Sequence, residues 1–243
     1  MTISAEELAE KIAGQRIERI ERRAKYILLR LSADTLAVHL KMTGRLYVLP
    51  AGEESENDRY LRVAFPLDND HELRFSDPRR FGRVLFGPSP DAILPTLGPE
   101  PLDDAFTLDA FRERLKGRSG ALKPLLLNQA FVAGIGNIYA DEALHIAKLH
   151  PRRTADSLSD DEIAGLYEAI RQALSDGVRY EGASVRWYRK ADGSKGQSQE
   201  HFRVYHDPRS EKDKRCLVCG SPISVIRVGQ RSAHFCPVCQ TLQ

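Results

Sequence analysis

The sequence predicts an α+β protein with a strand-rich first part, a helical second part and a small metal-binding hairpin near its C-terminal end. Short apolar runs separated by polar or glycine-bearing turns fill residues 26–86. From Thr107 onward apolar residues recur at helical spacing, and all four cysteines lie between Cys216 and Cys239. Strands grouped ahead of helices are typical of α+β proteins, and so many strands in a short stretch favour a sandwich or a barrel.

The composition is that of a globular protein. Of the 243 residues, 42% are hydrophobic and 29% are charged, which argues against a disordered, collagenous or coiled-coil chain. No window approaches the roughly 18 apolar residues of a membrane span. Residues 1–14 carry three glutamates where a signal peptide would be basic and then apolar. We therefore expect a cytoplasmic protein that does not enter a membrane.

Charge is unevenly distributed along the chain. Residues 1–111 hold 15 Lys and Arg against 19 Asp and Glu, whereas residues 112–243 hold 21 against 15. The basic second part favours a polyanionic partner, although so small an excess fits an ordinary solvated surface equally well.

The elements of the first part follow from local patterns. Ser4 with Glu7 three residues later predicts a helix that begins with a capping box. Strands are predicted over residues 26–31, 35–40, 45–49, 60–65, 72–75 and 83–86. Five of the 13 prolines lie between Pro88 and Pro101, where helix and central strand are both disfavoured, so this stretch is predicted to be a linker.

The second part is mainly helical. Helices are predicted over residues 108–115 and 122–127, with Pro124 in a first turn. Ser159 and Glu162 form a second capping box ahead of an apolar stripe that Gly177 is expected to end. Beyond Gly182 the chain is polar, with strand-like islands at residues 185–190 and 200–206.

The cysteines have the spacing of a zinc site. Cys216 and Cys219 form one CxxC pair and Cys236 and Cys239 a second. Sixteen residues separate the two pairs, a spacing that suits four thiolates around one structural zinc ion. The apolar run between the pairs predicts a hairpin, whose arginines could reach phosphates or a minor groove. Free cysteines or a disulfide pair are the alternatives, and a reducing compartment favours the metal.

Two other motifs are ambiguous by themselves. Residues 132–140 place two glycines and an asparagine before a predicted helix. The exposed amides at such a helix start could bind a phosphate, or the segment could be an ordinary connection between two helices. Residues 77–82, Asp-Pro-Arg-Arg-Phe-Gly, interrupt two strands and suit either insertion into a DNA duplex or a turn capped by aspartate.

Taken together, the motifs resemble those of the formamidopyrimidine-DNA glycosylase and endonuclease VIII family of base-excision-repair enzymes, and the first group more closely. The resemblance extends through RRAKYILL, HLKMTGRL, DPRRFGR, LGPEPL, LKPLLLNQ, VAGIGNIYADEAL and the CxxC pairs with GQRSAHF. It implies a β-sandwich domain over residues 1–104, a helix-two-turns-helix domain over 105–182, a connecting segment over 183–211 and a zinc finger over 212–243. It also implies a monomer that binds damaged double-stranded DNA at the nucleoid.

The resemblance assigns site residues one by one. Met42, Arg79 and Phe81 match the side chains that fill the gap left by a flipped base. Lys25 matches a catalytic-site lysine near the lesion. Phosphate ligands are matched by Lys123, Asn137 and Arg231, and residues 183–199 align with the loop that closes over the everted base.

The N-terminus departs from the family's pattern. Family members begin Met-Pro-Glu, and the proline attacks the sugar C1′ as an amine nucleophile. This sequence begins Met1-Thr2-Ile3, and residues 4–17 resemble a segment inside the family's first domain. We therefore expect the proline, its glutamate and the first helix to be missing, which leaves an incomplete sandwich. A misassigned start codon is favoured over a truncated product or pseudogene and over a catalytically silent paralogue, because every other motif is present.

The expected function is excision of oxidised purines such as 8-oxoguanine and formamidopyrimidine, with cleavage of the abasic site. The alternatives are a non-catalytic zinc-finger protein that binds damaged DNA and an oxidised-pyrimidine glycosylase of the endonuclease VIII type. Without the proline, Lys25 is the only candidate for a substitute nucleophile, and we expect little lyase activity from the printed chain.

Overall fold

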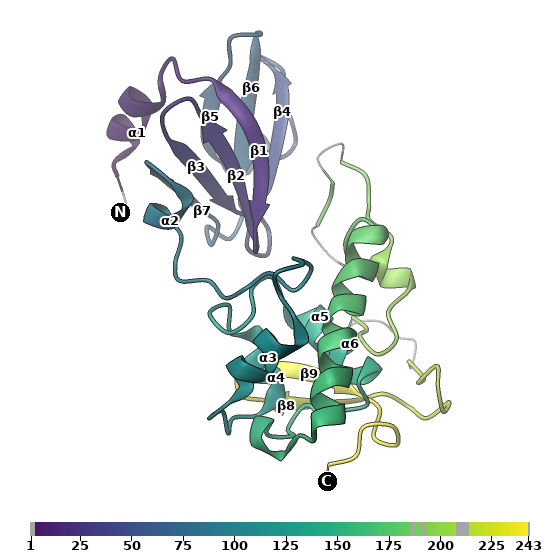
Figure 1. Ribbon diagram of the computed structural model, residues 1–243. Helices are drawn as coiled ribbons and strands as arrows, with labels where there is room; N and C mark the ends of the chain where they lie inside the picture. The colour runs from purple at the N-terminus through teal and green to yellow at the C-terminus, as the bar shows by residue number, and fades with distance from the viewer. Residues whose placement is uncertain (1–2, 186–187, 191–192, 208–213, 243) are drawn as a thin grey trace. The chain divides into compact units, whose positions relative to one another are not determined.

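The computed structural model describes residues 3–185, 188–190, 193–207 and 214–242, and it divides into two compact units (Figure 1). The first unit comprises residues 1–95 and 186–195, and the second comprises residues 96–185 and 196–243. The C-terminal hairpin thus belongs to the same compact unit as the helices. No helix among the described residues is both long and apolar enough to cross a bilayer.

The first unit is a sandwich of two antiparallel sheets rather than a barrel. One sheet has the order β1-β2-β3-β7, and the other has the order β4-β6-β5. The strands are β1 (Ile17–Arg23), β2 (Tyr26–Leu31), β3 (Thr35–His39), β4 (Arg45–Pro50), β5 (Leu61–Pro66), β6 (His71–Ser76) and β7 (Arg83–Gly87). All neighbouring strands in these two sheets run antiparallel.

Strand β2 lies at the centre of this arrangement because both of its faces are buried. Leu29 and Leu31 pack between the sheets with Phe75 of β6, whereas Tyr26 and Leu28 face the other side of the sheet. Side chains alternate across a strand, so a strand that is buried on both faces appears in sequence as a continuous apolar run.

Two elements of the first unit differ from the sequence prediction. Strand β1 was not predicted, since its charged sequence is largely exposed and it pairs as an edge strand with β2. The predicted linker contains a short helix, α2 (Pro90–Ile93), so the prediction of no helix there was wrong. Its N-cap is Ser89 and its first residue is Pro90, a position where proline is favourable. Helix α1 (Ala5–Ile12) is capped by Ser4 as predicted.

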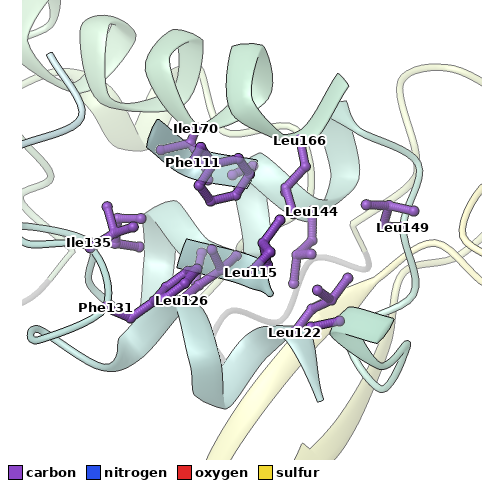
Figure 2. Close-up of a cluster of buried hydrophobic side chains, with 14 of the residues drawn as sticks. Phe111, Leu115, Leu122, Leu126, Phe131, Ile135, Leu144, Leu149, Leu166 and Ile170 are labelled. Atoms are coloured by element: carbon purple, nitrogen blue, oxygen red, sulfur yellow. The ribbon is translucent and has the colours of Figure 1, made fainter. Parts of the chain in front are cut away.

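The second unit is built on helices α3 (Leu108–Leu115), α4 (Leu122–Leu127), α5 (Asn137–Ile146) and α6 (Asp160–Arg179), with the hairpin β8 (Ser224–Val228) and β9 (Arg231–Phe235). Pro124 lies in the first turn of α4, and both halves of the capping box of Ser159 and Glu162 are formed. Single 3-10 turns cover Ala155–Ser157 and Ser198–Glu200 in this unit and Asp58–Tyr60 in the first unit. The helices enclose one apolar core (Figure 2), whose labelled members include Phe111, Leu126, Leu144, Leu166 and Ile170.

Helices α4 and α5 are joined by a connection over residues 128–136, which consists of a turn at residues 129–131 and a bend at residues 132–134. The Gln129 side chain stabilises this connection, since its Nε2 donates to the carbonyls of Leu127 and Ile135, both at 3.0 Å, and its Oε1 accepts from the Gly134 amide. Gly134 has a φ of +87°, which an L side chain rarely adopts. The connection is therefore a fixed structure that sets the position of the N-terminus of α5.

Two expectations for the second unit were wrong. Gly177 does not end the last helix, because α6 continues to Arg179. The segment from residue 200 to 206 is not a strand in the structure. Its amides at Arg203, Val204 and Tyr205 donate to the Glu142 carboxylate instead of to a neighbouring strand. Of the other predicted island, residues 186 and 187 lie outside the described residues, and Tyr188–Lys190 is not a strand.

Gly177 allows α5 and α6 to pack closely, and replacing it should destabilise the protein. A Cβ at this position would lie 2.6 Å from the Tyr139 ring. We expect Gly177→Ala to cost about 1–3 kcal/mol of unfolding free energy through overpacking. Gly165→Ala in the same helix meets no atom within 4 Å, and it should stabilise by about 0.5–1 kcal/mol. Denaturant unfolding of both variants checks this, and equal effects would contradict the packing role.

Candidate nucleic-acid interface and zinc site

Three of the predicted site residues come together on the surface of the first unit. Met42 follows β3, whereas Arg79 and Phe81 lie in the turn between β6 and β7. The Arg79 Nη1 lies 3.4 Å from the Met42 sulfur, and its guanidinium carbon lies 4.7 Å from the centre of the Phe81 ring. Met42 is 56% exposed and Phe81 is 52% exposed. We call these three residues the wedge cluster, because they present one cation between two exposed apolar side chains.

A buried aspartate fixes the turn that carries the wedge cluster. The Asp77 carboxylate accepts hydrogen bonds from the Thr43 hydroxyl, from the Arg79 amide at 3.2 Å and from the Gly82 amide at 2.8 Å. Burial alone would raise the pKa of Asp77, but these hydrogen bonds outweigh it and hold the pKa below its usual value. The turn is thus held by an ionised carboxylate, which ties the Met42 side and the Arg79 side of the cluster together through Thr43.

Lys25 lies half-buried in the turn between β1 and β2, within a group of cations. Burial and the charges of Lys41, Lys25 and Arg83 lower the pKa of His39 to about 4. The Lys41 amide donates to His39 Nδ1 at 3.0 Å, which is consistent with a neutral ring. This end of the sheet is therefore electropositive, as an anionic ligand would require.

The predicted phosphate ligands of the second unit differ in their exposure. Arg231 is exposed at the start of β9. Asn137 is half-buried at the first residue of α5, and its Oδ1 has no hydrogen-bond partner among the described residues. Lys123 is fully buried, and its ammonium bonds to the Asp141 carboxylate and the Ser232 carbonyl. The structure therefore places the Lys123 charge inside the protein.

The four cysteines fit a tetrahedral zinc site. All four sulfurs lie within 4.8 Å of one another, with Cys216 to Cys239 at 3.8 Å and Cys219 to Cys236 at 3.4 Å. Sulfurs bound about 2.3 Å from one ion stand about 3.8 Å apart at the corners of a tetrahedron, whereas a disulfide requires about 2.05 Å. Hydrogen bonds from Ser221 lower the pKa of Cys219, whereas burial raises the pKa of Cys236 and of Cys239, so a bound cation would be what holds these sulfurs as thiolates. The cluster is a site for one structural zinc.

The helical core supports the zinc site directly. His145 of α5 lies with Nε2 3.4 Å from the Cys216 sulfur. The side chain of Gln240 accepts from the Cys236 amide and donates to the Leu149 carbonyl, both at 2.8 Å. Sequence patterns predict neither contact, because these residues lie far from the cysteines in sequence or carry no recognisable motif. A histidine in the otherwise apolar end of α5 was the only available signal.

An exposed wedge on a β-sandwich, helices joined by a turn and a bend and a four-thiolate hairpin define the class of zinc-finger DNA repair glycosylases. The chain belongs to the formamidopyrimidine-DNA glycosylase family. Family models match its N-terminal domain over residues 1–84, its H2TH domain over residues 97–189 and the zinc finger found in FPG and IleRS over residues 213–242.

Individual relatives agree with this assignment. The formamidopyrimidine-DNA glycosylase of Herpetosiphon aurantiacus is 47% identical over 242 residues, a match that covers 98% of this chain and 86% of the relative. That of Pelotomaculum thermopropionicum is 44% identical, with the same coverage of both chains. A solved complex of Lactococcus lactis Fpg with DNA containing an abasic site is similar at a TM-score of 0.87 and 33% identity, covering 98% of this chain and 86% of that chain.

Proposed function

We propose that this DNA glycosylase acts on oxidised purines such as 8-oxoguanine and formamidopyrimidine in duplex DNA. A second Lactococcus lactis Fpg structure, 32% identical over 98% of this chain, holds DNA that contains Fapy-dG. The observation that carries the proposal is the wedge cluster. An enzyme that acts on a base within a duplex must first extrude it, and something must then fill the gap.

The chemistry of the wedge cluster suits that task. Extrusion costs a few kcal/mol of lost stacking and pairing, which inserted side chains partly offset. Met42 and Phe81 offer apolar surface at more than half exposure, and Arg79 adds a cation that stacks on the ring and interacts favourably with bases. In this proposal Asp77 keeps the three side chains together before DNA arrives, so that little ordering is needed on binding.

The remaining predicted residues take supporting roles in the proposal. Lys25 lies near the lesion, within the cationic end of the sheet. Asn137 and Arg231 bind phosphates, with the amides at the N-terminus of α5 and an exposed guanidinium as donors. Residues 183–199 close over the everted base, although residues 186–187 and 191–192 lie outside the described residues. The protein would act as a monomer in the cytoplasm, at the nucleoid.

The wedge cluster can be tested by binding to an abasic-site duplex and to the matching intact duplex. We expect Phe81→Ala and Arg79→Ala each to reduce the preference for the abasic duplex by roughly tenfold, equivalent to about 1.4 kcal/mol of lost gap filling. Val48→Ala, which removes another exposed apolar side chain from the first unit, should change nothing. Unchanged preference in both wedge variants would refute the assignment.

Excision assays separate the candidate activities. Release of 8-oxoguanine from a duplex supports the proposal, and preferential release of an oxidised pyrimidine would point to the endonuclease VIII type. Selective binding of the abasic duplex with no release of either base would favour a non-catalytic protein that binds damaged DNA.

A further inference from the structure

A network of polar groups around the fully buried side chains of Lys123 and Asp141 joins α4 and α5 to strand β9. Lys123 Nζ lies 2.5 Å from Asp141 Oδ1 and also donates to the Ser232 carbonyl at 2.5 Å. Asp141 Oδ2 accepts from the His234 amide at 3.1 Å and lies 3.0 Å from its Nδ1. The Lys123 and Asp141 side chains have no exposed surface. One carboxylate thus binds groups 18 and 93 residues away in sequence.

The network bonds to backbone groups of β9 as well as to the His234 side chain. Strand β9 pairs with β8 in a two-stranded sheet. The Ser232 carbonyl and the His234 amide are two residues apart, so they face the same edge of β9. Lys123 and Asp141 satisfy these two groups in the way that a third strand would. This fixes the position of β9 along and across the axis of α5, which apolar contacts alone would leave less strictly defined.

Both proposed phosphate ligands, Arg231 and Asn137, lie close to residues of this network in sequence. Arg231 directly precedes Ser232 on β9, and Asn137 precedes Asp141 by four residues, one turn along the same face of α5. The Arg231 charge also contributes to lowering the pKa of Lys123, although burial is the larger cause, so the guanidinium lies within electrostatic range of the network. Asp141 therefore connects the element that carries Asn137 to the element that carries Arg231.

Burying an ion pair is a poor way to gain stability, because desolvation offsets most of the attraction between the charges. Well-packed apolar residues of similar volume often stabilise a protein as much. A buried pair that also bonds backbone groups does determine geometry, since its hydrogen bonds are satisfied in only one arrangement.

We propose that Asp141, together with Lys123, is a positioning residue that sets the separation of Asn137 and Arg231 so that both reach phosphates of one duplex. The inference rests on the proposed function, in which these two residues are the phosphate ligands. Lys123 then contributes to DNA binding through Asp141 and β9, with no phosphate contact of its own.

The test compares Lys123→Met/Asp141→Leu, which removes the network while keeping its volume, with Arg231→Ala and with the variant that combines all three changes. Binding to an abasic-site duplex is measured over a range of salt concentrations. We expect Arg231→Ala to weaken binding about tenfold and to reduce the salt slope by about one unit. The paired variant should show the same two changes while retaining one zinc per chain. Adding Arg231→Ala to it should cause less than a further twofold loss.

Each contrary outcome has a distinct meaning. A wild-type slope and affinity in the paired variant, with a reduced slope in Arg231→Ala, overturns the positioning role and leaves the phosphate contact standing. An equal further loss when Arg231→Ala is added shows that the network acts through general stability, which also overturns it. A wild-type slope in Arg231→Ala refutes the phosphate contact itself, and the positioning role with it.

Two further variants serve as an alternative test and as a control. Asp141→Asn keeps the size of the side chain and one acceptor oxygen. If the paired variant loses its zinc, Asp141→Asn replaces it, and its affinity and salt slope are compared with those of Arg231→Ala in the same way. Asp109→Asn removes an aspartate that is 88% exposed in the same unit, and it should bind DNA as the wild type does.

Discussion

Removing the zinc is expected to unfold the C-terminal hairpin and to weaken binding to an abasic-site duplex by roughly 100-fold, or about 2.7 kcal/mol. The hairpin buries only a few apolar side chains of its own, among them Val228, Ala233 and Phe235. A two-stranded hairpin is marginal in water by itself, and Lys123 and Asp141 bond only to β9, so the fold of the rest of the hairpin depends on the metal. Its loss releases Arg231 and removes the partners of Lys123 and Asp141 on β9.

Cys236→Ser tests this most directly, because Cys236 is fully buried. We expect substoichiometric zinc by elemental analysis, rapid proteolysis confined to the region after residue 213 and the stated loss of affinity, while the helical core retains its far-ultraviolet circular dichroism. Val218→Ser changes an exposed residue, 67% accessible, within the same knuckle and should retain zinc. A zinc-free protein that binds the abasic duplex with undiminished affinity would overturn the structural role of the metal.

Glu142→Ala should destabilise the second unit more than any surface substitution. The Glu142 carboxylate is 3% exposed and accepts from the backbone amides of Arg203, Val204 and Tyr205 at 2.7, 2.9 and 2.8 Å. Hydrogen bonds to charged groups contribute about 1.5–3 kcal/mol each, and the truncation leaves several donors without a partner. We expect a loss of about 3 kcal/mol or more, which corresponds to a fall in Tm of roughly 6–12 °C.

The matched control is Glu168→Ala, which removes an exposed carboxylate from α6 and should change the unfolding free energy by less than about 0.5 kcal/mol. Thermal unfolding followed by circular dichroism gives both values. Hydrogen exchange should also show faster exchange of the three amides in Glu142→Ala. Equal Tm values for the two variants would mean that the segment from residue 203 to 205 is held by other contacts.

Much of the local structure could be predicted because its causes are local. The zinc ligands follow from two CxxC pairs, the caps of α1 and α6 follow from Ser4 and Ser159, and Pro124 falls in a first turn as its missing amide requires. The strands of the sandwich follow from alternating or continuous apolar runs. Strand β1 was missed because an exposed, charged edge strand carries little of that pattern.

The candidate site was predicted in part. Resemblance to the family selected Met42, Arg79 and Phe81, and the structure brings these three together. The resemblance does not select Asp77, whose hydrogen bonds fix the turn that carries these three side chains. Whether Asn137 and Arg231 bind phosphates stays a prediction, and the buried position of Lys123 could not be deduced from its sequence neighbours.

By itself, the sequence determined which residues bind zinc, where most helices and strands lie, and which turn carries the wedge. Only the tertiary structure decided that Lys123 and His234 share the Asp141 carboxylate, that Gly177 accommodates Tyr139, and that residues 203–205 bond to Glu142 and form no strand. The first set follows from residue types and spacings along the chain: periodicity and capping for helices and strands, two CxxC pairs for zinc, and motif resemblance for the wedge turn. The contacts that only the tertiary structure decided join residues that are far apart in sequence. A buried carboxylate needs hydrogen-bond donors, and the fold rather than the neighbouring sequence determines which donors lie beside it.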